Sequence, residues 1–213
     1  MRRVFVDPLA PQQDAIAEAA KWIALGRVVA IPTDTLYGLA VDPFQADAVA
    51  RIFDVKGRSA DRALPLIAAD AAQVAAALGT LSALARQFAD RYWPGPLTLL
   101  LAAPGGLARN VTGGSGTVGV RVPAHAIARG ICAACDRLVT ATSANISGGA
   151  PTSDPDVVEK VLGDRVDFLL DAGPTPGGAA STIVDVTGAE PRLIRDGAIS
   201  WDTIQTWVNT VGA

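Results

Sequence analysis

The chain has 213 residues, of which 50% are hydrophobic and 18% charged, a composition that excludes a disordered protein and allows one well-buried domain. The formal net charge of −3 argues against a broad surface for nucleic-acid backbone, but not against a small internal anion site. No apolar run approaches the length that crosses a bilayer, and Val4-Phe5-Val6 is too short for the core of a signal peptide. We therefore expect a cytoplasmic protein with no membrane partner.

Hydrophobic periodicity predicts helices that alternate with short apolar strands along the chain. The predicted helices cover residues 12–25, 45–55, 70–78, 81–92, 125–135, 155–162 and 201–211. The predicted strands cover residues 27–31, 64–68, 97–101, 117–122, 138–142, 167–171, 181–186 and 192–195. Some strands follow each other without a helix between them, and no linker is long enough to separate domains. The pattern predicts an α/β fold, with one mixed sheet flanked by helices in a single domain over residues 1–213.

Small polar side chains follow several apolar strands at the point where each strand ends. The strand 27–31 is followed by Pro32, which ends its ladder, and by Thr33-Asp34-Thr35. Tyr37 and Gly38 come next, where we expect a turn. Two later strands end or begin in the same way, at Thr142, Ser143, Asn145, Ser181 and Thr182. Ligands in open α/β sheets lie beyond strand ends, so the recurrence favours one pocket over the alternative that these residues merely cap helices and turns.

Basic side chains form a second group of candidates. Lys56 falls in the last turn of a predicted helix, where it can complement the helix dipole. Arg58 lies beyond Gly57, outside the helix, and a guanidinium on such a loop suits bidentate binding of phosphate oxygens. Arg121 lies inside an apolar strand, so it either points into a polar cavity or pairs with a buried carboxylate. Arg195, at the end of another strand, is a weaker case of the same kind.

Metal and imidazole chemistry find little support in the sequence. Cys132 and Cys135 fall in a predicted helix, and His125 is the only histidine, so a zinc site lacks ligands. A redox pair would need exposed thiols of low pKa, and we expect two mostly buried helix cysteines instead. An enzyme with one histidine should work by positioning and charge stabilisation, a profile that suits phosphoryl and nucleotidyl transfer.

Seven segments carry a resemblance to a known family. They are PTDTLYGL (32–39), KGR (56–58), YWPGPLTLLL (92–101), TVGVRVP (117–123), SANISG (143–148), STIVDV (181–186) and LIRDG (193–197). In this order they resemble the YrdC-like family, whose members include L-threonylcarbamoyladenylate synthases. The resemblance runs from about residue 12 to residue 200 and implies a twisted mixed sheet around a large basic cavity.

The resemblance also implies an activity. L-threonine, bicarbonate and ATP would give L-threonylcarbamoyl-AMP and pyrophosphate, which makes the protein a nucleotidyltransferase. Mg²⁺ would arrive with ATP rather than in a metal site of the protein. A downstream transferase complex would move the threonylcarbamoyl group to the adenosine beside the anticodon of certain tRNAs, and we expect weak or no direct binding of tRNA to this chain.

Residue roles follow from the positions of the matched motifs. The resemblance assigns catalysis to Lys56 and Arg58. It assigns threonine binding to Thr33, Thr35, Tyr37, Arg121, Ser143 and Ser181. It assigns ATP binding to Lys56, Arg58, Thr117, Asn145, Ser153 and Arg195.

The sequence departs from the family pattern at two positions, and two other functions stay open. Ala68-Ala69-Asp70 follows Pro65-Leu66-Ile67 where longer members often carry a histidine, and Ser59 stands where proline is common. The chain ends near the end of the synthase domain, so we expect the short form without the extra C-terminal domain.

One alternative to the synthase activity is an RNA-binding or ribosome-assembly module of the same fold. The other is the carbamoyl-transfer domain of hydrogenase maturation proteins.

Overall fold

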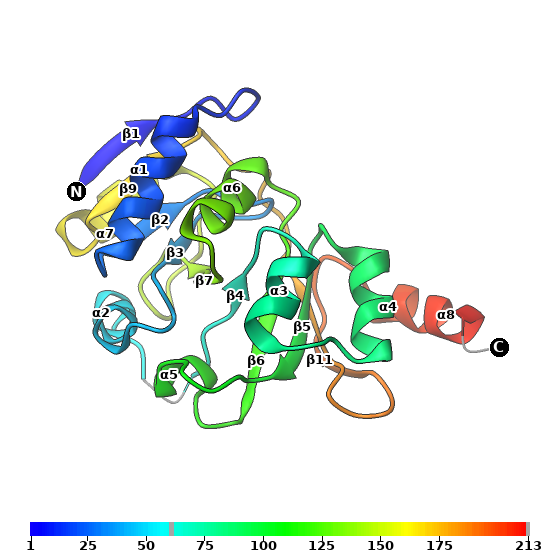
Figure 1. Ribbon diagram of the computed structural model, residues 1–213. Helices are drawn as coiled ribbons and strands as arrows, with labels where there is room; N and C mark the ends of the chain where they lie inside the picture. Colours follow the sequence, from blue (N-terminus) through cyan, green and yellow to red (C-terminus); the bar gives the residue numbers. More distant parts are fainter. Residues whose placement is uncertain (60–61, 212–213) are drawn as a thin grey trace.

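The computed structural model describes residues 1–59 and 62–211, which form two mixed sheets with helices around them (Figure 1). Residues 60, 61, 212 and 213, which fall within the predicted single domain, lie outside the described residues. The five-stranded sheet has the order β1 (Arg2–Phe5), β9 (Phe168–Asp171), β2 (Val29–Ile31), β3 (Gly38–Ala40), β8 (Thr142–Ser143). The six-stranded sheet has the order β11 (Arg192–Arg195), β10 (Thr182–Asp185), β5 (Leu97–Ala102), β6 (Thr117–Arg121), β4 (Leu66–Ile67), β7 (Val139–Thr140). The helices are α1 (Gln13–Ala24), α2 (Ala46–Lys56), α3 (Ala71–Leu78), α4 (Ala83–Tyr92), α5 (Arg109–Thr112), α6 (Ala126–Cys135), α7 (Pro155–Leu162), α8 (Trp201–Val211) and the 3-10 turn η1 (Gly163–Arg165).

The mixed α/β class is confirmed, but the strands divide between two sheets where the sequence predicts one. The predicted strand 138–142 breaks at Ala141, whose N–H bonds to the carbonyl of Pro65. Its first half, β7, pairs with β4, and its second half, β8, pairs with β3 of the other sheet. The segment therefore passes from one sheet to the other, and it brings hydroxyl-bearing strand ends of both sheets to a common place.

The predicted helices and strands occur within a few residues of their expected ends, and four elements are additional. β1 is an edge strand in which two arginines interrupt the apolar pattern, and η1 and α5 are short. β3 begins at Gly38, where the sequence predicts a turn. The bend falls instead at residues 34–36, so β2 and β3 run antiparallel with that bend between them. The polar segment after the first strand is thus a hairpin connection.

The two faces of the five-stranded sheet are covered by different helices (Figure 1). Val29, Ile31 and Phe168 pack in one cluster with the apolar side chains of α1 and α6. Ala30 and Leu169, which point the other way, pack in a second cluster with those of α2 and α7. Because side chains alternate along a strand, burial on both faces explains the continuous apolar runs of these strands.

Two left-handed glycines end helices and direct the chain that follows. Gly26 (φ 71°) follows α1, and the N–H groups of Gly26 and Arg27 bond to the carbonyls of Ile23 and Trp22. Gly57 (φ 58°) ends α2 in the same way. Glycine adopts positive φ without the steric cost that a Cβ brings, so it suits this cap. The turn at Gly57 carries the chain away from the helix axis toward the space between the sheets.

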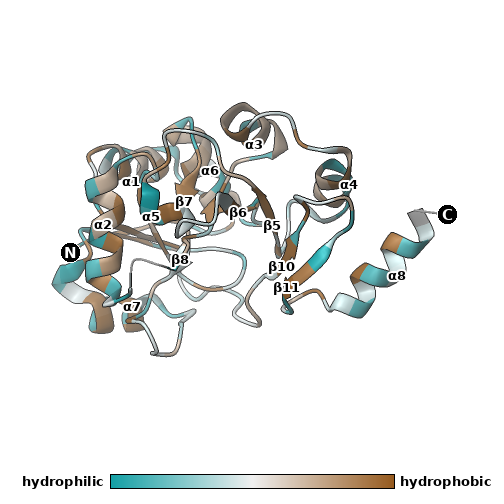
Figure 2. Cartoon of the chain, turned by 90° about the horizontal axis from the view of Figure 1, so that it is seen from below, coloured by the Kyte–Doolittle hydropathy of each residue, from teal (hydrophilic) through white to brown (hydrophobic). Residues whose placement is uncertain are grey.

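The C-terminal helix α8 lies at the end of the molecule away from α1 and α2 (Figure 2). It packs on α4, where the ring of Trp207 meets Phe88 and Tyr92 edge to face at centroid distances of 5.0 and 5.3 Å. Among the described residues, no helix is both long and apolar enough to cross a membrane.

Candidate functional site

A cavity of about 470 Å³ lies where the two sheets meet. Its wall comes from the β2–β3 connection, from β4, β5 and β6, from residues 141–143, and from the start of β10. The cavity brings together eight of the residues predicted from the sequence: Thr33, Thr35, Tyr37, Arg58, Arg121, Ser143, Ser181 and Arg195. The strand-end hydroxyls and the isolated arginines therefore belong to one place in the fold.

The other four predicted site residues lie outside the cavity wall. Lys56 and Asn145 are buried behind it, in contact with Ser143. Thr117 lies at the start of β6, beside Ser115, with which it shares a hydroxyl hydrogen bond of 3.0 Å. Ser153 accepts a hydrogen bond from the N–H of Thr175 through its carbonyl oxygen. Assignments of these four residues to ATP stay predictions.

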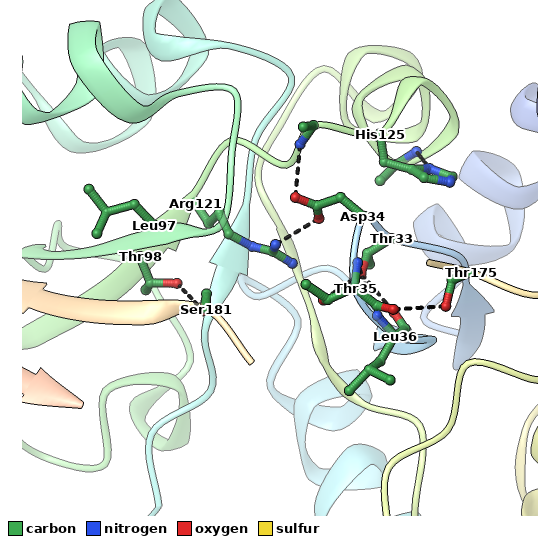
Figure 3. Close-up of polar contacts among 12 residues, drawn as sticks. Thr33, Asp34, Thr35, Leu36, Leu97, Thr98, Arg121, His125, Thr175 and Ser181 are labelled. Carbon is green, nitrogen blue, oxygen red and sulfur yellow. Dashed lines mark hydrogen bonds and ion pairs between the residues drawn. The ribbon is translucent and has the colours of Figure 1, made fainter. Parts of the chain in front are cut away.

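The hydroxyl of Thr33 holds the bend that carries it (Figure 3). It donates to the carbonyl of Leu36 at 2.7 Å and accepts from the N–H groups of Thr35 and Leu36. The carbonyl of Thr35 accepts from the hydroxyl of Thr175 at 2.9 Å and from the N–H of Gly177 at 2.8 Å. Residues 175–177, which precede β10, therefore hydrogen-bond to this bend. The bend is held by its own Thr33 hydroxyl and by this second segment.

Tyr37 contributes a buried ring to the wall. Its hydroxyl donates to the carbonyl of Gly173 at 2.8 Å and accepts from the N–H of Ala172 at 3.1 Å. Burial raises the pKa of the phenol well above its usual range. The hydroxyl is thus already used as donor and acceptor inside the protein, and the ring shapes the cavity.

Three guanidinium groups line the cavity. Arg58 donates to the hydroxyl of Thr142 and to the carbonyl of Ala63, and Arg195 donates to the carbonyl of Ser181 at 2.7 Å. Burial, and to a smaller extent the positive charge of Arg121, lowers the pKa of Arg195. Among the described residues of the wall, none is a carboxylate. The cavity is therefore suited to anions.

Lys56 and Asn145 join the motif residues into one hydrogen-bonded unit. The ammonium group of Lys56 donates to the carbonyl of Ser143 and to both oxygens of Asn145, while the hydroxyl of Ser143 donates to the Asn145 side chain at 2.6 Å. Burial, with a smaller effect of Arg58, lowers the pKa of Lys56 to about 8. The pair supports the wall from behind, and Arg58 and Ser143 form the wall.

Two residues in or beside the site escape the reasoning from sequence. Thr98, inside the apolar strand β5, lines the cavity and shares a hydrogen bond of 2.8 Å with the hydroxyl of Ser181. Asp34 forms an ion pair of 2.7 Å with Arg121. The only signal for Thr98 is a polar residue in an apolar run, and the signal for Asp34 is its place between two threonines. Arg121 thus fulfils both alternatives, since it faces a cavity and pairs with a carboxylate.

The cysteines take the place that the sequence predicts. Cys132 and Cys135 are free thiols on α6, Cys132 is fully buried, and burial raises the pKa of Cys135 to about 11. In the part of the chain that the structure describes, no group of three or more His, Cys, Asp and Glu side chains is placed to hold a metal ion.

The fold and the site define the class of this protein: a two-sheet α/β protein with an arginine-lined cavity between its sheets. Residues 21–197 match the Sua5_yciO_yrdC family model, which carries the description telomere recombination, and the chain belongs to this family. The resemblance seen in the motifs is thereby confirmed.

Relatives and solved structures agree with the family. The threonylcarbamoyl-AMP synthase of Pyrococcus abyssi is 39% identical over 91% of this chain, which spans 57% of that protein. A putative threonylcarbamoyl-AMP synthase of Mycobacterium tuberculosis is 35% identical over 89% of this chain and 87% of its own length. The crystal structure of P. abyssi Sua5 complexed with L-threonine superposes with a TM-score of 0.91 and 35% identity, over 97% of this chain and 60% of that one. The chain thus spans less than two thirds of the P. abyssi protein.

Proposed function

We propose that the protein is a threonylcarbamoyl-AMP synthase, a nucleotidyltransferase that makes L-threonylcarbamoyl-AMP and pyrophosphate from L-threonine, bicarbonate and ATP. The observation that carries the proposal is the cavity lined by Arg58, Arg121 and Arg195 together with the hydroxyls of the two sheets. The substrates bring a carboxylate, a bicarbonate and a triphosphate, so a wall of guanidiniums matches them in charge. Relatives with this name and the threonine complex of P. abyssi Sua5 support the choice of substrates.

The reaction needs two bond-forming steps. Bicarbonate takes up a proton and loses water to give CO₂. The neutral amine of threonine attacks the carbon of CO₂, an N–C bond forms as one C=O π bond opens, the amine loses a proton, and a carbamate results. A carbamate oxygen then attacks the α-phosphorus of ATP, the bond from that phosphorus to the β-bridging oxygen breaks, and pyrophosphate leaves. Both steps depend mainly on alignment and on stabilisation of negative charge, and neither needs an imidazole.

The wall residues divide between these tasks. In the proposal Arg121 pairs with the threonine carboxylate, which leaves the amine free to react. Arg58 neutralises charge on the phosphates in the transition state, and Lys56 adds its charge from behind the wall. The hydroxyls of Thr35, Ser143 and Ser181 line the cavity, and each keeps a lone pair that can orient threonine beside its protein partner. Thr33 and Tyr37 act by shaping the pocket, because their hydroxyls are engaged inside the protein.

We expect Mg²⁺ to be carried by the phosphates of ATP. The described wall offers hydroxyls and guanidiniums rather than carboxylates, which fits an ion that keeps phosphate and water ligands. When bound, Mg²⁺ would offset negative charge on the phosphates and on the leaving pyrophosphate.

Threonylcarbamoyl-AMP is a mixed anhydride, so a transferase must consume it. We propose that this partner is the complex that modifies the adenosine beside the tRNA anticodon. Since the basic side chains of the site face a cavity and the net charge is −3, free tRNA should bind only at micromolar or weaker affinity, on the order of non-specific binding at physiological salt. Tight and steeply salt-dependent binding of bare tRNA would support the RNA-module alternative.

The proposal is tested by pyrophosphate release from ATP and Mg²⁺ with the purified chain. Release should require L-threonine and bicarbonate together, and mass spectrometry should detect threonylcarbamoyl-AMP. Serine should be a poorer substrate, because a missing methyl group costs roughly 1–3 kcal/mol in a small pocket. Equal release of pyrophosphate without threonine would exclude this function.

A further inference from the structure

The three residues Thr33, Asp34 and Thr35 do not all face the cavity. Thr33 and Thr35 line it, whereas Asp34 does not belong to the wall. Asp34 points instead toward Arg121 and toward the segment that precedes α6 (Figure 3). The bend therefore places two hydroxyls on the cavity side and the carboxylate between them on another side.

The carboxylate of Asp34 is itself held in place. One oxygen accepts from Nη1 of Arg121 at 2.7 Å, and the other accepts from the N–H of Ala124 at 3.1 Å. The hydroxyl of Thr33 ties down the bend on the other side of Asp34. Both charged side chains of the pair are 10% exposed, so solvent screens the interaction only weakly.

Arg121 is held by one nitrogen only. Within the described part of the chain, Nη1 bonds to Asp34 and the structure gives Nε and Nη2 no hydrogen-bond partner, while the side chain belongs to the cavity wall. The carboxylate of Asp34 binds Nη1 of the planar guanidinium, and the donors on Nε and Nη2 stay available to an anion in the cavity. The guanidinium is thus oriented before any ligand binds.

Two roles for Asp34 make opposite predictions. If Asp34 only offsets the excess positive charge of three arginines, its neutralisation should tighten the binding of anions. If Asp34 orients Arg121, its neutralisation should weaken the ligand that Arg121 receives, because the long side chain then has to be immobilised on binding. The hydrogen bond from Ala124 favours the second role, since charge balance alone requires no fixed geometry.

We propose that Asp34 is a positioning residue that holds Arg121 by Nη1 and presents its remaining donors to the carboxylate of the amino-acid substrate. This inference rests on the proposed function and deepens it. It states that the ion pair between Asp34 and Arg121 strengthens the binding of threonine and leaves the binding of ATP unchanged. Asp34 acts through Arg121 and does not touch the substrate.

The test uses Asp34→Asn in the full chain. Asparagine preserves the shape but has one acceptor oxygen, so it serves Arg121 or Ala124 and not both. The KM for threonine should rise about tenfold, the difference between a charged and a neutral hydrogen bond, while the KM for ATP stays within about twofold. Threonine binding measured by calorimetry should weaken by the same factor. The matched control is Asp185→Asn, which neutralises a carboxylate paired with Arg192 outside the cavity and should change neither constant.

A double-mutant cycle separates positioning from a general loss of structure. In an Arg121→Lys background, Asp34→Asn should raise the threonine KM by no more than about twofold further, because its effect passes through the guanidinium. If the wild type makes product and Asp34→Asn binds threonine as tightly as the wild type or more tightly, the inference is overturned. Equal losses for threonine and ATP, or full additivity in the cycle, would overturn it too. If the wild type itself makes no threonylcarbamoyl-AMP, the proposed function fails instead.

Discussion

The ammonium group of Lys56 donates hydrogen bonds to both oxygens of Asn145, to Oδ1 at 3.0 Å and to the main-chain carbonyl at 2.9 Å. The carbonyl of Lys56 in turn accepts from the N–H of Ser147 at 2.8 Å. The end of α2 is thereby cross-linked to the segment after β8, across 89 residues of sequence. The cross-link fixes Ser143 in the cavity wall, so Lys56 has a structural task beside any effect of its charge on substrates.

Replacement of Lys56 by methionine should therefore cost stability. Three acceptors lose the ammonium donor, and Oδ1 of Asn145 keeps only the hydroxyl of Ser143. We expect the free energy of unfolding to fall by about 3 kcal/mol at neutral pH, measured by urea unfolding. Leu78→Met, a change of partly buried side chain on α3, is a control that should cost far less. A wild-type stability in Lys56→Met would contradict the cross-link.

The loss caused by Lys56→Met should grow with pH. In the folded protein the pKa of Lys56 is lowered to about 8, against 10.5 for an ordinary lysine. Between these values the unfolded chain binds more protons than the folded one, so this group makes the wild type more stable as pH rises. The difference in unfolding free energy between wild type and Lys56→Met should be larger at pH 9.5 than at pH 7.5, and an equal difference would contradict the lowered pKa.

Arg58→Ala should damage turnover and spare the fold. Arg58 donates to Thr142 and Ala63, which belong to the cavity wall, and we expect stability to change by no more than about 0.5 kcal/mol. Loss of a charge that stabilises the transition state should lower kcat by about 10²–10³-fold. Arg192→Ala removes an arginine whose side chain is 75% exposed and should leave kcat unchanged. Full activity in Arg58→Ala would show that the charge of Arg58 does not stabilise the transition state.

Tyr37→Phe should have the opposite effect. It keeps the ring in the wall but leaves Gly173 without a donor and Ala172 without an acceptor in a buried place. The free energy of unfolding should fall by about 1–3 kcal/mol, while the KM for threonine stays close to the wild-type value. A large rise in that KM with no loss of stability would show that the hydroxyl serves the substrate directly.

Gly197→Ala should disturb the site from outside it. A Cβ at Gly197 would clash with the carbonyl oxygen of Ala180 and lie 2.8 Å from the carbonyl of Ser181, so backbone that carries a cavity residue has to move. We expect a loss of about 1–3 kcal/mol in stability together with weaker threonine binding in calorimetry. Gly105→Ala, where a Cβ meets nothing within 4 Å, is the matched control. Equal behaviour of the two variants would contradict the close approach.

The elements and the polar strand ends follow from the sequence alone. Apolar periods and glycine caps such as Gly26 and Gly57 are local properties, since they depend on side-chain spacing and on backbone freedom within a few residues. The motif residues likewise predicted which family the chain resembles. Local patterns also explain the errors, because the arginines of β1 interrupt its apolar pattern and no glycine or proline separates β7 from β8.

Only the tertiary structure decided which strand ends meet and which way each side chain points. Arg121 and Asp34 are 87 residues apart in sequence, so no local pattern joins them. The sequence placed Lys56 in a last helical turn, a position usually exposed, and only the packing of α2 against the segment after β8 buries it beside Asn145. Strand pairing and packing act over the whole chain, and they turn scattered hydroxyls and arginines into one cavity between two sheets.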